Sequence, residues 1–130
     1  MSEDFWPQDL LDNIPRTPKT ILEEQAAALG PKTKNIVQAK VKSAIDPEGD
    51  FHHSFVLTCN ALGTYQYTLF VVWHGVSLYP VHHDNLEFED EYEFKRHLKD
   101  ILGTPRTAQM VRALVAQAQG VKAADDDVPF

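Results

Sequence analysis

Residues 51–73, FHHSFVLTCNALGTYQYTLFVVW, decide the fold. Across residues 51–62, apolar and polar side chains alternate with the two-residue period of a β-strand. Gly63-Thr64 predicts a tight turn, and residues 65–73 are rich in the β-branched and aromatic side chains that strands favour. Two strands joined by so short a turn run antiparallel. The side chains predicted to share one face of the first strand are Phe51, His53, Phe55, Leu57 and Cys59.

Two further strands are predicted beside this pair. Residues 35–43 alternate loosely, and the turn at 46–50 contains a proline that presets φ and a glycine that accepts positive φ. His74-Gly75 is predicted to turn the chain into a short strand over residues 76–81. About four successive strands with short turns predict an antiparallel meander. The side chains that share parity on the 65–73 strand, and are expected in the core, are Tyr67, Leu69, Val71 and Trp73.

Helix signals flank the predicted sheet on both sides. The start signals are Thr17-Pro18, Asp90 with Glu93, and Thr104-Pro105. The stop signals are Gly30-Pro31, Gly103 and Gly120. The order of elements predicts a single α+β domain over residues 17–120. We expect one N-terminal and two C-terminal helices, packed on one face of the sheet.

The two ends of the chain differ from this domain in their sequence patterns. Prolines in residues 1–16 predict an irregular lead-in rather than a long helix. Its apolar side chains are too many for a free tail, and we expect them to pack on the body or on a partner. They are Phe5, Trp6, Leu10, Leu11 and Ile14. Residues 121–130 are predicted to form an acidic flexible tail.

Composition narrows the function classes. The formal net charge of −7 disfavours a general coat for duplex DNA, which needs a basic face to displace counterions. The single cysteine, Cys59, excludes an intrachain disulfide and is expected in the core. The N-terminus lacks the pattern of a signal peptide, and the most apolar run, residues 68–73, is too short to span a bilayer. We therefore expect a cytoplasmic protein without membrane contact.

The last six residues, Asp125-Asp126-Asp127-Val128-Pro129-Phe130, are the strongest candidate for a functional element. Pro129 fixes its own φ and favours an extended conformation at the residue before it. A terminal phenylalanine joins an apolar ring to a carboxylate, which suits a pocket with an apolar floor and a basic rim. The aspartates add steering toward a basic partner and a strong dependence on salt.

This hexapeptide resembles the C-terminal tail of bacterial single-stranded-DNA-binding proteins (SSB). The resemblance covers about the last seven residues, and the preceding domain does not resemble that family. In the family, the acidic tail recruits replication, recombination and repair proteins. The resemblance therefore implies that Pro129 and Phe130 are anchors, and that Asp125, Asp126 and Asp127 form the charged approach to a partner of this class.

A second candidate is a face for single-stranded nucleic acid. Lysines at alternate positions, with aromatic side chains on a nearby strand, are typical of a basic and aromatic binding platform. The residues of this candidate face are Lys32, Lys34, Lys40, Lys42, Tyr65 and Tyr67. The competing interpretation is a solvated strand face beside core aromatics, which the parity of Tyr67 with Leu69 favours.

Histidines and acids supply a third candidate, a small metal-dependent enzyme. The histidines are His52, His53, His74, His82, His83 and His97. We expect no metal and no cofactor, because neighbouring histidines on a strand point to opposite faces and no zinc-type spacing is present. The acidic run between residues 84 and 93 is expected to be a loop followed by a helix N-terminus, where acids are favoured. The sequence thus predicts a non-enzymatic interaction protein of bacterial or phage DNA metabolism.

Overall fold

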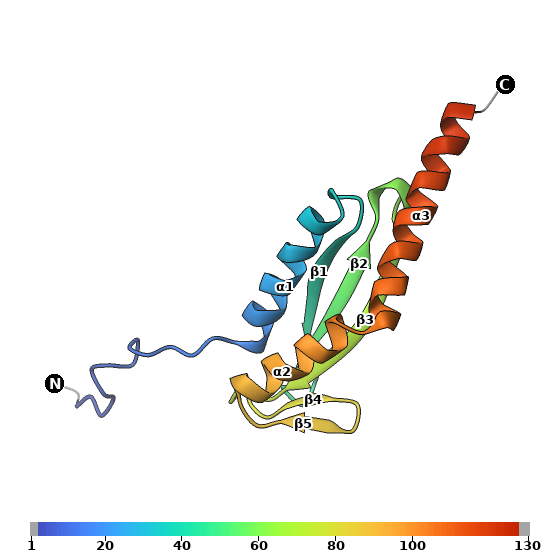
Figure 1. Cartoon of the computed structure of the whole chain (residues 1–130). Helices are drawn as coiled ribbons and strands as arrows, with labels where there is room; N and C mark the ends of the chain where they lie inside the picture. The colour runs from blue at the N-terminus through green and yellow to red at the C-terminus, as the bar shows by residue number, and fades with distance from the viewer. Residues whose placement is uncertain (1–2, 128–130) are drawn as a thin grey trace.

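The protein is an α+β domain built on one antiparallel sheet, as shown by a computed structural model that describes residues 3–127 and the side chains of residues 3–121 (Figure 1). The strands are β1 (Gln38–Ile45), β2 (Phe51–Thr58), β3 (Gln66–His74), β4 (Val81–His83) and β5 (Leu86–Phe88). The helices are α1 (Pro18–Lys32), α2 (Glu91–Leu102), α3 (Pro105–Asp127) and the short 3-10 helix η1 (Asn60–Leu62). The strand order β1-β2-β3-β4-β5 confirms the predicted meander.

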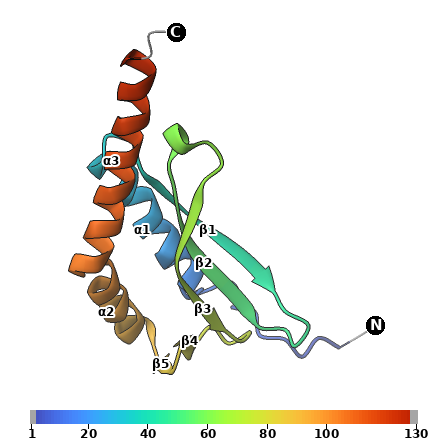
Figure 2. The ribbon, with the colours of Figure 1, turned by 90° about the vertical axis from the view of Figure 1, so that its right-hand side faces the viewer.

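The three α-helices lie on one side of the sheet, and no helix of residues 3–127 covers its opposite, open face (Figure 2). The core fills the space between the two layers. Its most deeply buried large side chains are Leu22, Val37, Leu57, Val72, Val81 and Phe94. In the same residue range, no helix is both long and apolar enough to cross a bilayer.

Strand β2 places most of the predicted inward-facing side chains in the core, and Val56 of the opposite parity is buried as well. On β2, the buried side chains include His53, Phe55 and Leu57, and Cys59 just beyond the strand is also buried, as predicted. On β1, Lys40 and Lys42 lie on the exposed face. The predicted turn between these strands is confirmed, since Gly49 adopts a φ of 87° and the Asp46 carboxylate accepts hydrogen bonds from two backbone N–H groups of the turn.

The predicted strand over residues 76–81 is wrong. Val76 is 85% exposed, Leu78 has a φ of 76°, and Pro80 has no N–H group to donate to a ladder. The chain crosses this region as a loop and forms the β4–β5 hairpin only afterwards, with Asp84 at positive φ in the turn. The sheet accordingly has five strands rather than about four.

A β-bulge in β3 changes which side chains reach the core. Phe55 pairs with Phe70 but Val56 pairs with Thr68, so Leu69 is an extra residue on β3. After the bulge, the buried residues are Phe70, Val72 and His74, whereas Val71 is exposed. Val71 and Trp73 therefore lie on the open face. The expected core position of these two residues was wrong, whereas Tyr67 and Leu69 do pack against the core.

The predicted helix starts are confirmed by their capping hydrogen bonds. The Thr17 hydroxyl accepts from the Thr20 N–H at 3.0 Å, and the Asp90 carboxylate accepts from the Glu93 N–H at 2.9 Å. The predicted helix ends are less accurate. Helix α1 continues past Gly30 to Lys32, and α3 continues through Gly120 to Asp127. A single glycine inside a helix costs about 1 kcal/mol relative to alanine, which weakens a helix without ending it.

Candidate functional site

The acidic hexapeptide begins in the last turn of α3. The backbone of Asp125–Asp127 is helical, and Val128, Pro129 and Phe130 lie outside the described residues. The C-terminal turns of α3 extend past the sheet, so that the helix carries the start of the hexapeptide away from the folded body (Figure 1). Gln119, Gly120 and Val121, which precede this part of the helix, are exposed.

The amino-acid sequence of this last turn is unfavourable for a helical backbone. Unpaired carbonyl groups give a helix C-terminus a partial negative charge. Three successive aspartates at this end add further negative charge, which is electrostatically unfavourable. Aspartate also has a weak helix propensity. Three aspartates are therefore unfavourable residues for the last turn of α3.

An apolar groove lies between α1 and α3, with the sheet as its floor. Its volume is about 710 Å³. Phe55 and Leu57 of β2 and Leu69 of β3 form the floor. The aliphatic residues of its walls and lower end are Leu29, Ile36, Leu102, Val111 and Val115, and all five are only half-buried. Small side chains at Ala28, Ala108 and Ala116 border the same groove.

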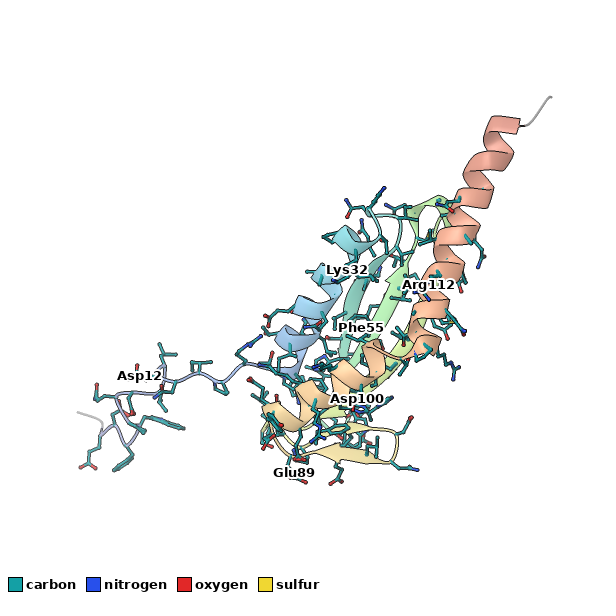
Figure 3. The ribbon with its side chains drawn as sticks, viewed as in Figure 1. Asp12, Lys32, Phe55, Glu89, Asp100 and Arg112 are labelled. Atoms are coloured by element: carbon teal, nitrogen blue, oxygen red, sulfur yellow. The ribbon has the colours of Figure 1, made fainter. Side chains whose placement is uncertain are left out.

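The charged residues that line this groove are all basic. Lys32, Lys34 and Arg112 line it, and no acidic residue is among the described residues that do so. In Figure 3, Lys32 on α1 and Arg112 on α3 flank Phe55 on the sheet. The sequence did not reveal this site, because it arises only when α1 and α3 are placed side by side. The available signal was the spacing of Ala108, Val111, Arg112 and Val115 on one side of α3.

The residues of the predicted nucleic-acid face fall into separate regions. Lys40 and Lys42 lie on the open face of the sheet, whereas Lys32 and Lys34 line the groove on the helix-covered side. Tyr65 is 45% exposed in the loop before β3, and Tyr67 packs against the core. The structure therefore brings Lys40 and Lys42 together on one side of the sheet and Lys32 and Lys34 together on the other, and does not join the two pairs.

The open face also carries an aromatic row that runs across three strands. Trp73 stacks on His82 with ring centroids 3.9 Å apart, and on His52 at 6.1 Å. These three side chains come from paired positions of β2, β3 and β4. Because Trp73 already stacks closely on His82, a nucleic-acid base would have to displace that imidazole to use the same ring face.

Four of the six histidines form two hydrogen-bonded pairs rather than one cluster. His53 pairs with His74, and His83 Nδ1 lies 2.8 Å from His97 Nε2. His83 therefore does not join His53 and His74. Within the described residues, no group of three or more histidine, cysteine or acidic side chains is placed to hold a metal ion. Cys59 is 1% exposed, as expected of a core cysteine.

A chain of hydrogen bonds connects the buried pair to the edge strand. His74 Nδ1 donates to the Gly75 carbonyl at 2.7 Å, so a neutral His74 accepts at Nε2 from His53 Nε2–H. His53 Nδ1 then accepts from the Ser43 hydroxyl at 2.7 Å. Burial, followed by the proximity of His74, Lys19 and His52, lowers the pKa of His53 to about 4.

This arrangement is unsuited to activating Ser43 as a nucleophile. An effective general base has a pKa near the working pH, and the imidazolium that forms needs a stabilising carboxylate. His53 has a pKa of about 4, and the partner at its second nitrogen is another imidazole. The pair is better understood as a buried network in which both neutral rings are satisfied.

The acidic run from Asp84 to Glu93 occupies structural positions. Asp84 is in the β4–β5 turn, Glu87 is in β5, and Asp90 caps α2, whose first turn contains Glu91 and Glu93. The favourable interaction of acids with a helix N-terminus explains the second half of the run. The prediction of a loop and a helix start is confirmed for these residues, with the addition of β5.

Comparison of the chain with protein-family models, with curated proteins and with solved structures finds no match.

Proposed function

We propose that this chain is a non-enzymatic interaction protein of bacterial or phage DNA metabolism. In this proposal, the C-terminal hexapeptide docks onto cytoplasmic replication, recombination or repair proteins that bind SSB tails. The observation that carries the proposal is the hexapeptide itself, Asp125 to Phe130, at the end of a helix that leads away from the body.

The chemistry of the hexapeptide defines the receptor. The Phe130 ring requires an apolar pocket, and its carboxylate requires a cationic group at the rim of that pocket. The three aspartates favour a basic approach surface, which raises the association rate and makes it dependent on salt. Binding places no demand on the sheet or on the histidine pairs, so the folded body serves to present the tail.

A competition experiment tests this function. A fluorescent peptide with an SSB tail sequence is bound to a purified receptor of such tails, and the full chain is added at low and moderate salt. The full chain should displace the peptide, less effectively at higher salt, and a chain that lacks Phe130 should need a concentration about tenfold higher or more to do so. Equal displacement by the two chains would show that the hexapeptide is not the docking element.

Single-stranded DNA binding is the second candidate function. It is favoured by the position of Lys40 and Lys42 on the helix-free face, which also carries Trp73. In this alternative the phosphates contact the lysines, and a base competes with His82 for the Trp73 ring.

A further inference from the structure

Residues 3–16 form an arm that leaves the folded body. Its five large apolar side chains are strongly exposed: Phe5 87%, Trp6 71%, Leu10 55%, Leu11 87% and Ile14 63%. Figure 3 shows Asp12 on the arm, well away from the sheet and helices. The sequence led us to expect that these side chains pack on the body or on a partner. The structure shows that they do not pack on the body.

The arm combines exposed apolar side chains with acidic ones, a composition typical of a segment that binds another surface. Isolated exposed apolar residues are common on proteins, but five large ones within a short segment mark an interaction site. The arm is also acidic, with Glu3, Asp4, Asp9 and Asp12. Its one basic residue, Arg16, is paired with Glu24 of α1. The surface that receives this arm must therefore be both apolar and basic.

The groove between α1 and α3 has these two properties. Its half-buried aliphatic walls leave apolar surface in contact with solvent, and Lys32, Lys34 and Arg112 supply positive charge without an acidic residue among the described lining. In a chain of net charge −7, such a site is selective for an acidic and apolar segment. A volume of about 710 Å³ accommodates several side chains.

The geometry of the arm favours a groove on another molecule. Thr17 enters α1 with φ −82° and ψ 155°, an extended conformation that the following Pro18 favours. This conformation directs the arm away from the body, whereas α1 lines the groove with residues 25–32 of its second half. To enter its own groove, the arm would have to reverse direction at Thr17.

We propose that the arm, residues 3–16, binds the α1/α3 groove of a second copy of this chain. Each copy donates one arm and accepts one, which gives a closed, two-fold symmetric dimer. This inference does not depend on the proposed function of the tail, because it involves different residues and a different partner.

The test uses full-length protein in which Trp73→Phe leaves Trp6 as the only tryptophan. Sedimentation equilibrium gives the dimer fraction over a concentration series, and Trp6 emission reports burial of the arm. The two readouts should change together, with a blue shift of emission as dimer forms. Leu10→Ser/Leu11→Ser, which alters only exposed arm positions, should weaken the dimer at least tenfold.

Two charge reversals probe the groove. Arg112→Glu should weaken the dimer at low salt, whereas Arg96→Glu, an equal change of charge at an exposed position of α2 outside the groove, should not. Ala116→Phe, which occupies the groove from an exposed position, should also weaken it. A monomer at all concentrations, or a dimer unaffected by the arm substitutions, would overturn the proposal. So would a dimer that requires Phe130 instead of the arm, since the occupant would then be the tail.

Discussion

The Nε2 atoms of His53 and His74 lie 2.9 Å apart, and the two imidazoles that they belong to are each 3% exposed. Their outer nitrogens are occupied by the Ser43 hydroxyl and the Gly75 carbonyl. This chain of bonds is complete with both rings neutral. A proton added at His53 Nδ1 would replace the hydrogen bond that this atom accepts from the Ser43 hydroxyl, and would put a charge in a site shielded from water.

The first consequence concerns stability in acid. Because the pKa of His53 is lowered from 6.5 to about 4, the unfolded chain binds a proton that the folded chain excludes between these values. The free energy of unfolding should therefore fall as the pH decreases from 6.5 to about 4, by about 3 kcal/mol at most. Urea denaturation over this pH range measures the effect.

A matched variant tests whether His53 is the group that causes this pH dependence. His53→Gln removes the titrating group and should reduce the slope of unfolding free energy against pH. A smaller slope should remain, because burial and the proximity of His83 also lower the pKa of His97. An unchanged slope in the variant would mean that His53 is not the group responsible.

A second prediction concerns Tyr79, whose hydroxyl is buried without a hydrogen-bond partner in the described residues. An unpartnered buried hydroxyl costs free energy, so Tyr79→Phe should leave stability unchanged or raise it by about 1 kcal/mol. Tyr92→Phe, at a residue that is 71% exposed, is the control and should have no effect. A loss of stability on removing the Tyr79 hydroxyl would contradict the absence of a hydrogen-bond partner for this group among the described residues.

The same burial, followed by the charges of Glu91 and Asp90, raises the pKa of Tyr79 to about 12. Absorbance of tyrosinate during an alkaline titration should show one residue that ionises near this value. The signal should disappear in Tyr79→Phe. Its persistence would assign it to another tyrosine.

A third prediction concerns binding of single-stranded DNA to the open face of the sheet. If single-stranded DNA binds there, an oligonucleotide should change the fluorescence of Trp73 at low salt, and added salt should reverse the change. Lys40→Glu should weaken this response, whereas Lys95→Glu on α2 should not. No response at low salt would remove this alternative function. Trp6→Phe is the appropriate background, because it leaves Trp73 as the only tryptophan.

Local sequence signals were sufficient for much of the fold. The alternation in β2 identified its buried face, and Thr17, Asp90 and Thr104 marked the helix starts, because each signal depends on a few neighbouring residues. The bulge at Leu69 was not predictable from one strand, since a bulge exists only relative to the pairing of two strands. It reversed the positions expected for Val71 and Trp73.

Long-range features were harder to predict. Strands β4 and β5 have three residues each, too few to show a period. The groove required knowledge that Lys32, from the end of α1, lies opposite Arg112 of α3. The sequence instead grouped Lys32 with Lys40, which lies on the other side of the sheet. The hexapeptide was identified from adjacent residues alone, and its docking role stays a prediction.

The most direct test of the central claim is the affinity of the full chain and of a chain lacking Phe130 for one purified receptor of SSB tails, measured by calorimetry. Burial of one phenylalanine ring contributes about 1.5–3 kcal/mol, so the deletion should weaken binding about tenfold or more. Val121→Ala, outside the hexapeptide, should bind like the full chain. Equal affinities with and without Phe130 would contradict docking through the tail.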